Sequence, residues 1–392
     1  MEIKTLGELC DIVSGGTPSR SKAEFWNEGT IPWIKIGNIK GKYVNEADEF
    51  ITQEGLAGSS AKMLAKGTVL YTIFATLGEV GILEIDACTN QAIAGLTIKD
   101  TNQLSTDYLY YYLRSKKAYV NNVGRGVAQN NINMSILRSF ELPLPELSKQ
   151  IEIVEIIDKV SKIIEARQQE LECLDDLIKA RFVEMFGEPQ INPFHWDVVN
   201  ISEVVGGKVS NGFFAKRDDY CDDGNVSILG VANIVNRMYS KVNELPKTNA
   251  NNKDIAKFEV KYGDMLFCRS SLVAEGIGKA SIVPEDVHEN VLFECHVIRL
   301  PLNLNKCVPE FMQTLSTMDF FRNQVVAQSK TATMTTIGQD GILKTDIILP
   351  PIEKQKEFYD FVKQVDKSKV AVQKSLDETQ QLFDSLMQKY FG

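Results

Sequence analysis

One long segment occurs twice in this chain, and this duplication limits the folds that are open to it. The first copy occupies residues 142–187 and the second begins at residue 348. Six positions recur at a constant offset of 205 residues: Leu144, Pro145, Gln150, Glu152, Phe186 and Gly187 return as Leu349, Pro350, Gln355, Glu357, Phe391 and Gly392. A chain that repeats one plan presents two equivalent structural units and two equivalent sites.

Each copy predicts a long helix with a coiled-coil seam. Neither copy has internal glycine or proline, and each begins just after proline and ends at Phe-Gly. Apolar residues with an alternating spacing of four and three make up the two seams: Ile153, Ile157, Val160, Ile164, Leu171, Leu174, Ile178 and Met185, then Phe358, Val362, Val365, Val372, Leu376, Phe383, Leu386 and Tyr390.

Four polar positions interrupt these seams, namely Arg167 and Arg181 in the first and Lys369 and Thr379 in the second. Two matched seams favour helices that pair with each other over two separate helices packed on their own domains. A helix of about 36 residues would form a rod of about 54 Å.

The segments before the helices predict globular domains. Short β-branched and aromatic runs are broken by Gly, Asn and Asp, as in strands and loops, and helical patterns occur at Thr106–Asn121 and Val308–Gln324. Leu6–Ile39 aligns weakly with Ile201–Ile234 at an offset of 195 residues. We therefore expect α/β (α+β) domains in tandem duplicate, each followed by a long helix, with boundaries at 1–145, 146–187, 188–350 and 351–392.

Composition fits a globular protein of more than one domain. The chain has 392 residues, with 44% hydrophobic and 24% charged. Its seven cysteines include no CxxC pair, and no apolar run is long enough for a signal peptide or a membrane span, so we expect a cytoplasmic protein. The net charge of −9 gives no support for nucleic-acid binding, but it leaves room for a local basic face.

Catalytic motifs are incomplete in this sequence. NPF at 192–194 and LPPI at 349–352 lack the residues with which adenine methyltransferases hold a flipped base. GIGKA at 276–280 lacks the first glycine and the hydroxyl of a phosphate loop. Asp254 with the EVK triplet at 259–261 is spaced too closely for a nuclease metal site, and the three histidines have no metal-ligand spacing. These gaps favour a binding protein with no catalytic residues, no metal and no cofactor of its own.

Polar loops with basic residues lie at equivalent places in both halves. Small residues allow close approach to phosphate, while Asn, Lys and Arg match base edges. Any one of these residues is more simply a solvated turn position, but as a matched set they favour DNA binding. The candidates are Thr17, Ser19, Arg20, Lys22, Lys35, Asn38, Lys40, Lys42, Arg125, Gln129 and Asn130 in the first half, and Asn211, Lys216, Arg217, Asn233, Arg269, Ser270, Lys330, Thr331 and Thr333 in the second.

The sequence resembles the specificity subunit of type I restriction–modification enzymes. The resemblance covers the whole chain and is carried by SGGTPSR…FWNEGTIPWIKIGNI near the start, Asn90-Gln91, LPLPELSKQIEI, LPPIEKQKEF and the two-copy layout. It implies that 1–145 and 188–350 are target-recognition domains that each read one half of a split, asymmetric DNA sequence. It also implies that the two helices form an antiparallel coiled coil with pseudo-two-fold symmetry, which sets the spacing between the half-sites.

The same resemblance implies partners. The family's subunit has no catalytic site and docks two methyltransferase (modification) subunits, which carry S-adenosylmethionine, and the assembly recruits ATP-driven motor-nuclease (restriction) subunits with their magnesium. The second half departs from the first at its opening, where SNGF replaces SGGTP. We do not expect loop contacts to transfer one to one.

Two other functions remain open at this point. A self-contained DNA methyltransferase or nuclease would require an intact cofactor or metal motif. A coiled-coil scaffold whose globular domains bind protein would show no sequence-dependent affinity for DNA.

Overall fold

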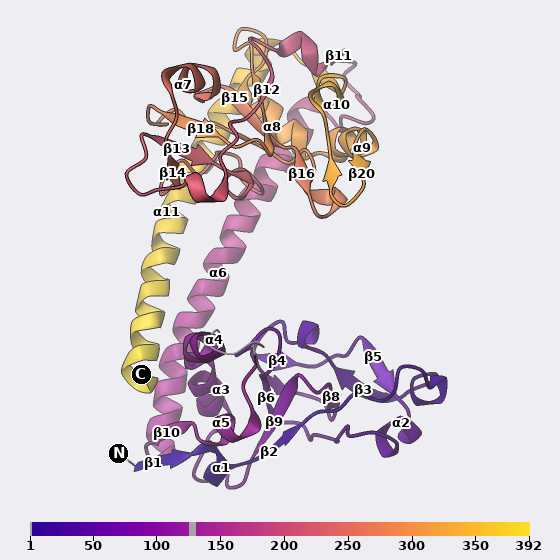
Figure 1. Ribbon diagram of the computed structural model, residues 1–392, viewed down its shortest axis with the longest axis vertical. Helices are drawn as coiled ribbons and strands as arrows, with labels where there is room; N and C mark the ends of the chain where they lie inside the picture. Colours follow the sequence, from indigo (N-terminus) through magenta and orange to yellow (C-terminus); the bar gives the residue numbers. More distant parts are fainter. Residues whose placement is uncertain (1, 125–130) are drawn as a thin grey trace. The chain divides into compact units, whose positions relative to one another are not determined.

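Two helices of 40 residues each, α6 (Leu147–Phe186) and α11 (Ile352–Phe391), follow the two globular segments (Figure 1). The computed structural model describes residues 2–124 and 131–392. The chain divides into unit 1, made of Met1–Gln168 and Lys374–Gly392, and unit 2, made of Gln169–Gln373. Each unit therefore contains one globular segment, one half of α6 and one half of α11.

Proline and glycine define the ends of these helices. Helix α6 begins two residues after Pro145 and ends before Gly187, which has a φ of +78°. A residue with positive φ directly after a helix is a common stop signal, and glycine adopts it without strain. Helix α11 begins directly after Pro351, whose fixed φ suits a helix start.

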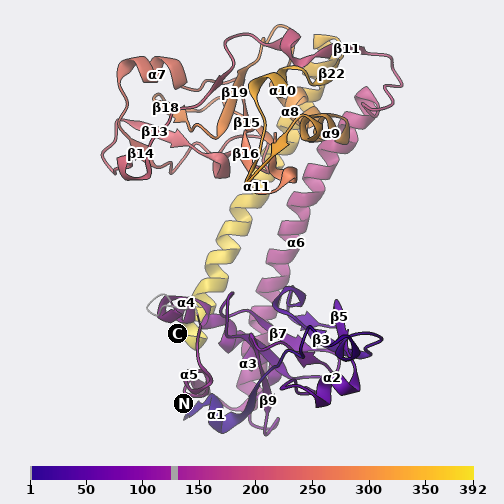
Figure 2. The same cartoon turned by 45° about the vertical axis from the view of Figure 1, so that its right-hand side comes forward.

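The two helices pack against each other within each unit and run antiparallel there (Figures 1 and 2). In unit 1 the beginning of α6 meets the end of α11, and Ile157 and Phe383 belong to one buried cluster. In unit 2 the end of α6 meets the beginning of α11, where the rings of Phe182 and Phe358 lie 5.5 Å apart. The predicted pairing of the two seams is therefore present in both units.

Polar residues that interrupt the seams make contacts between the helices. In unit 1 the guanidinium of Arg167 donates a hydrogen bond to the hydroxyl of Thr379. In unit 2 the ammonium of Lys369 lies 2.6 Å from the carboxylate of Asp175. The fourth interruption, Arg181, places its guanidinium carbon 5.6 Å from the centroid of the Phe361 ring on α11. All four interruptions thus contact the other helix, which favours one register over its neighbours.

Unit 1 is built around a five-stranded sheet of order β2-β9-β6-β7-β4, beside a three-stranded sheet of order β5-β3-β8 and the pair β1-β10. Its strands are β1 (Glu2–Thr5), β2 (Cys10–Ser14), β3 (Ile31–Ile34), β4 (Tyr43–Val44), β5 (Glu49–Ile51), β6 (Val69–Thr72), β7 (Val80–Leu83), β8 (Cys88–Thr89), β9 (Ile93–Ile98) and β10 (Glu141–Leu144). Its short helices are α1 (Leu6–Leu9), α2 (Gln53–Ala57), α3 (Thr106–Ser115), α4 (Lys117–Gly124) and α5 (Met134–Arg138).

Unit 2 has a four-stranded sheet of order β12-β19-β15-β17, two three-stranded sheets of order β14-β13-β18 and β16-β21-β20, and the pair β11-β22. Its strands are β11 (Asp197–Asn200), β12 (Ser210–Asn211), β13 (Val226–Leu229), β14 (Lys247–Thr248), β15 (Asp264–Cys268), β16 (Ser270–Ser271), β17 (Ala280–Ile282), β18 (Val291–Phe293), β19 (Val297–Pro301), β20 (Lys330–Thr331), β21 (Thr335–Thr336) and β22 (Asp346–Leu349). Its short helices are α7 (Asn252–Phe258), α8 (Pro309–Thr317), α9 (Asp319–Ala327) and α10 (Gln339–Leu343).

The two units share one topology. Strand β6 lies between β7 and β9 with antiparallel pairing, and β15 lies in the same way between β17 and β19. The parallel pair β3–β8 corresponds to the parallel pair β13–β18. The main buried cluster of each unit joins the central strands and α3 or α8 to both long helices. The tandem α/β fold expected from the repeat is confirmed.

The helical patterns at 106–121 and 308–324 are confirmed, but neither range is one continuous helix. Each is two helices, α3 and α4 or α8 and α9, with a break at Lys116 and at Met318. Met318 has the extended values φ −76° and ψ 149°, and the Lys116 ammonium donates a 2.9 Å hydrogen bond to the Phe391 carbonyl. Apolar spacing continues across both breaks, so periodicity alone does not detect them.

A buried glutamine ties the start of α6 to the globular part of unit 1. Gln150 is 0% exposed, and its Oε1 accepts a 2.9 Å hydrogen bond from the backbone N–H of Ser105. Its Nε2 donates to the carbonyls of Gln103 at 2.7 Å and Pro145 at 2.9 Å. The carboxamide thus fixes the beginning of α3, the beginning of α6 and the segment between them.

The same contacts recur in unit 2. Gln355 is 0% exposed, and its Oε1 accepts from the N–H of Val308 at 2.9 Å. Its Nε2 donates to the carbonyls of Lys306 at 3.2 Å and Pro350 at 2.7 Å. The repeated Gln in the sequence is therefore a repeated structural contact.

All seven cysteines are free and form no disulfide bond. Among the residues that the structure describes, no helix has the length and apolarity needed to cross a membrane.

We predict that Gln355→Leu lowers the free energy of unfolding of the full chain by about 3 kcal/mol, because three buried backbone groups lose their partner. Urea unfolding followed by circular dichroism measures this loss. Gln364→Leu, an exposed position on the same helix, serves as the matched control and should change stability by less than about 0.5 kcal/mol. Equal losses in the two variants would contradict the role assigned to Gln355.

Candidate nucleic-acid interface

A glycine starts the polar loop at the same place in both units. A Cβ on Gly15 would lie 2.2 Å from the carbonyl oxygen of Asn90, and a Cβ on Gly212 would lie 2.2 Å from that of Glu294. No side chain fits at such distances, so each chain segment can cross its neighbour only with glycine there. The openings SGGTP and SNGF therefore differ in sequence but keep the glycine that the crossing needs.

Arg20 forms the centre of an aromatic and charged cluster in unit 1. Its guanidinium carbon lies 3.7 Å from the centroid of the Trp26 ring and 5.0 Å from that of Trp33. Its Nη1 lies 2.5 Å from a carboxylate oxygen of Glu49. The side chain of Arg20 is still 54% exposed, so its remaining N–H groups face solvent. Stacking and ion pairing hold this guanidinium in one orientation.

Lys35 shares the same carboxylate. Its ammonium lies 2.6 Å from Glu49 and 4.0 Å from Asp48. The hydrogen bond from Arg20, followed by that from Lys35, holds the pKa of Glu49 below its ordinary value. Two cations thus converge on Glu49, which orders both side chains, and Asp48 lies at the edge of the cluster.

Asn38 and Asn233 have a structural role that the sequence pattern did not reveal. Asn38 is 8% exposed, and its Oδ1 accepts a 2.9 Å hydrogen bond from the N–H of Lys35. The Oδ1 of Asn233 accepts a 3.0 Å hydrogen bond from the N–H of Gly230. Each side chain closes the short turn that follows β3 or β13. The weak sequence alignment of the two halves is correct at this point.

Lys42 lies away from the Arg20 cluster. Its ammonium is 2.9 Å from a carboxylate oxygen of Asp107, on α3, and 2.9 Å from one of Asp158, on α6. Burial alone would lower the pKa of Lys42, but hydrogen bonds to both carboxylates outweigh it and hold that pKa above its ordinary value. In this structure Lys42 joins the sheet edge to α3 and α6.

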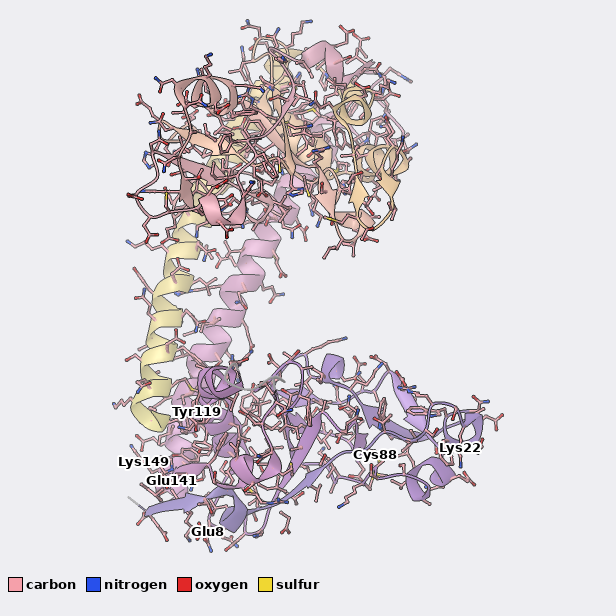
Figure 3. The ribbon with its side chains drawn as sticks, in the orientation of Figure 1. Glu8, Lys22, Cys88, Tyr119, Glu141 and Lys149 are labelled. Carbon is pink, nitrogen blue, oxygen red and sulfur yellow. The ribbon has the colours of Figure 1, made fainter. Side chains whose placement is uncertain are left out.

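The other candidates of unit 1 lie on exposed loops. Figure 3 shows Lys22 at the end of unit 1 that carries α2 and β5, and Lys149 at the opposite end, near the start of α6. The Lys22 ammonium lies 4.7 Å from the centroid of the Phe25 ring. Ser19 and Lys40 are exposed, and the half-buried Thr17 donates a hydrogen bond to Oε1 of Gln91. Arg125, Gln129 and Asn130 lie outside the described residues.

A small sheet gathers four candidates of unit 2. Strand β21 pairs with β16 on one side and with β20 on the other. This brings Ser270 beside the hairpin that carries Lys330, Thr331 and Thr333, whose side chains are exposed. Arg269 precedes β16, and its guanidinium donates a 3.2 Å hydrogen bond to the Cys295 carbonyl. The segments 269–270 and 330–333, which the sequence predicted as separate loops, thus form one surface.

The remaining candidates of unit 2 lie on other segments. Asn211 ends β12, and its Oδ1 is 3.2 Å from the side-chain nitrogen of Gln339. Lys216 is exposed, and its backbone N–H donates a 2.7 Å hydrogen bond to Asp219. Arg217 begins the following turn, Arg217–Asp219.

Sequence reasoning missed Trp26, Trp33 and Glu49 as parts of the site. The signal was present in part, since the aromatic residues at 25, 26 and 33 lie between basic residues at 20–22 and at 35–42. The ion pairs themselves join residues far apart in sequence, which periodicity does not reveal. Among the described residues, no three His, Cys, Asp or Glu side chains gather as a metal site.

Two globular segments of one topology, each packed on parts of both long helices, define a tandem two-domain protein. The sequence matches the family described as "Type I restriction modification DNA specificity domain" over residues 1–173 and 193–380, and this chain belongs to that family.

Curated relatives agree with this assignment. The MjaIX specificity subunit of a type I restriction enzyme from Methanocaldococcus jannaschii is 26% identical over 257 residues, covering 60% of this chain and 58% of that protein. The EcoR124I/EcoR124II specificity subunit from Escherichia coli is 29% identical over 195 residues, covering 45% and 48%. The chain thus spans about half the length of these two relatives. The EcoKI specificity subunit from Escherichia coli is 20% identical, covering 99% of this chain and 88% of that protein.

Solved structures share the fold. The S subunit of a type I restriction–modification system from M. genitalium aligns with a TM-score of 0.50 and 14% identity, covering 100% of this chain and 96% of that chain. A chain from a structure on complex assembly and conformational transition of the type I R-M system aligns with a TM-score of 0.53 and 15% identity, covering 100% and 97%. At this identity the likeness concerns the fold alone.

We predict that Lys42→Met lowers the free energy of unfolding by about 1–2 kcal/mol, because it leaves the half-buried carboxylates of Asp107 and Asp158 without their shared cation. Urea unfolding of the full chain is the measurement, with Lys40→Met, an exposed neighbour, as the control. Adding Asp158→Asn to Lys42→Met should restore part of the loss. A Lys42→Met variant as stable as the control would refute the structural role of this lysine.

Proposed function

We propose that this chain is the DNA-recognition subunit of a type I restriction–modification complex and that each unit reads one half of a split, asymmetric target. The observation that carries the proposal is the family match, which extends over both halves of the chain. The shared topology of the two units supports it, because two equivalent folds can address two half-sites with different loops.

The loop chemistry supports DNA as the ligand. In unit 1, a stacked Arg20 with free N–H groups is suited to the O6 and N7 acceptors of guanine, and Lys35 is held beside it by Glu49. In unit 2, the exposed hydroxyls of Thr331 and Thr333 and the ammonium of Lys330 suit phosphate oxygens and base edges. We assign these side chains the first contacts with DNA in their units.

Lys42, Asn38 and Asn233 have a positioning role in this proposal. Lys42 is engaged by two carboxylates, and the two asparagines close turns with their own backbone. Their substitution should disturb the loops or the helix contacts before it changes any base contact.

The chain would act with partner subunits. With a net charge of −9 it has little long-range attraction for DNA, so partners would supply much of the basic surface. We propose that two methyltransferase subunits dock on it, bringing S-adenosylmethionine, and that motor-nuclease subunits bring ATP and magnesium. In this scheme the chain itself contributes recognition and no catalysis.

The paired helices would set the spacing between the half-sites. Each helix has 40 residues, and the polar contacts along the pair restrict sliding of one helix past the other. A fixed register is what a spacer of constant length requires.

Co-expression with a cognate methyltransferase subunit, followed by single-molecule mapping of methylated adenines, tests the proposal. A split, asymmetric methylated motif is expected. Arg20→Ala should relax the specificity of one half-site only, with a loss of about 1–3 kcal/mol in discrimination. Lys62→Ala, an exposed lysine of the same unit, is the control. An unmethylated genome despite a stable complex would refute the proposed function.

Removal of seven residues from each long helix tests the spacer. Seven residues of helix correspond to about 10 Å, or about three base pairs of DNA. We predict that the mapped motif keeps both half-site sequences and changes only the number of bases between them. A variant with new half-site sequences would contradict a spacing role for the helices.

A further inference from the structure

Unit 2 has a cavity of about 460 Å³ lined by residues 239–243, Tyr262, residues 284–286 and side chains of the helices α8 and α11. Three tyrosines line it, namely Tyr239, Tyr262 and Tyr359. Glu310 lines it from α8, and Lys363 lines it from α11. The loops assigned to DNA contain none of these residues, so the cavity is a separate feature of the unit.

Glu310 is a buried carboxylate with one oxygen unpaired. The residue is 1% exposed, and its Oε1 accepts a 3.1 Å hydrogen bond from the hydroxyl of Tyr239. Within the described residues, its Oε2 has no hydrogen-bond partner. Burial raises the pKa of this carboxyl. A buried acceptor without a partner costs free energy, so a ligand that donates to Oε2 would stabilise the unit.

Unit 1 shows which group satisfies the equivalent carboxylate. Ser105 and Val308 donate the same hydrogen bond to the two repeated glutamines, which makes Asp107 the counterpart of Glu310, two residues further on. In unit 1 the ammonium of Lys42 lies 2.9 Å from Asp107. In unit 1, therefore, a lysine ammonium is the group that pairs with the carboxylate at this position.

In unit 2 the counterpart of that lysine has no charge. The N–H of Ile82 donates to the carbonyl of Lys42 at 2.8 Å, and the N–H of Ile282 donates to the carbonyl of Met238 at 2.8 Å. Met238 thus occupies the place of Lys42. Unit 2 thus has a carboxylate, Glu310, at the position of Asp107, but methionine at the position of the lysine that pairs with Asp107.

The lining of the cavity suits an ammonium group. The faces of tyrosine rings attract cations, and aromatic cages bind alkylammonium groups in this way. Beyond Glu310, the carboxylates of Glu285, Asp286 and Asp366 line the cavity, against the two cations Lys241 and Lys363. The Lys363 ammonium lies 3.4 Å from the Tyr359 hydroxyl, and its side chain is exposed.

We propose that this cavity binds a primary alkylammonium group, with Glu310 as its counter-ion and Tyr239, Tyr262 and Tyr359 as its aromatic walls. The group is either a free alkylamine or a lysine side chain of a subunit bound to this chain. The inference does not depend on DNA recognition, because it rests on the cavity and its counterpart in unit 1.

Isothermal titration of the full chain with n-butylamine, which has the length of a lysine side chain, tests the proposal. Saturable binding of one equivalent is expected, and n-butanol, its neutral isostere, should not bind. Glu310→Gln should weaken amine binding by at least about tenfold. Glu203→Gln, an exposed glutamate of the same unit, should bind the amine as the unaltered chain does.

Two results would overturn the proposal: no amine binding by the chain, or amine binding of equal strength after Glu310→Gln. If Glu310→Gln fails to fold, the comparison of amine with alcohol on the unaltered chain decides alone. Titration of the complex with its methyltransferase subunits then identifies the source. Persistent binding indicates a free amine, whereas loss of binding indicates a lysine supplied by the partner, and either result supports an ammonium site.

Discussion

A buried glutamine carboxamide at the start of each long helix is the contact on which the arrangement of each unit depends. Gln150 and Gln355 each bond to three backbone groups that belong to the beginning of the long helix and to the beginning of the preceding short helix. Without this contact, three buried or half-buried backbone groups would lose their partner in each unit. With it, the direction in which the long helix leaves the globular part is fixed.

The net charge of a chain says little about its local charges, and this protein illustrates why. Arg20 and Lys35 share one carboxylate, whereas Lys42 is held by two. The first arrangement leaves the Arg20 guanidinium 54% exposed, whereas the second encloses the Lys42 ammonium between its partners. Recognition surfaces in an acidic chain thus depend on how each carboxylate is shared, and sequence counts do not contain this information.

Helices, repeats and the fold class were predictable because they depend on local spacing. Proline before the seams and Gly187 after the first of them define the helix ends within one residue or two. The break at Met318 was not predictable, since apolar spacing continues through it. The site was predictable only as a set of loops. The pairing of Arg20 with Glu49 and of β16 with β21 joins residues distant in sequence, and such pairs follow from the tertiary fold.

The different charges at the two globule–helix contacts have a consequence for how such a protein can change. Asp158 on α6 has Lys363 as its repeat counterpart on α11, 205 residues further on. Exchange of the two globular segments would place the Lys42–Asp107 pair against Lys363, and Glu310 against Asp158. Lys42 would lose the second carboxylate that now holds it, and Glu310 would gain a like charge beside it. Each globular segment is thus fitted to the side chain that its own helix presents at this position.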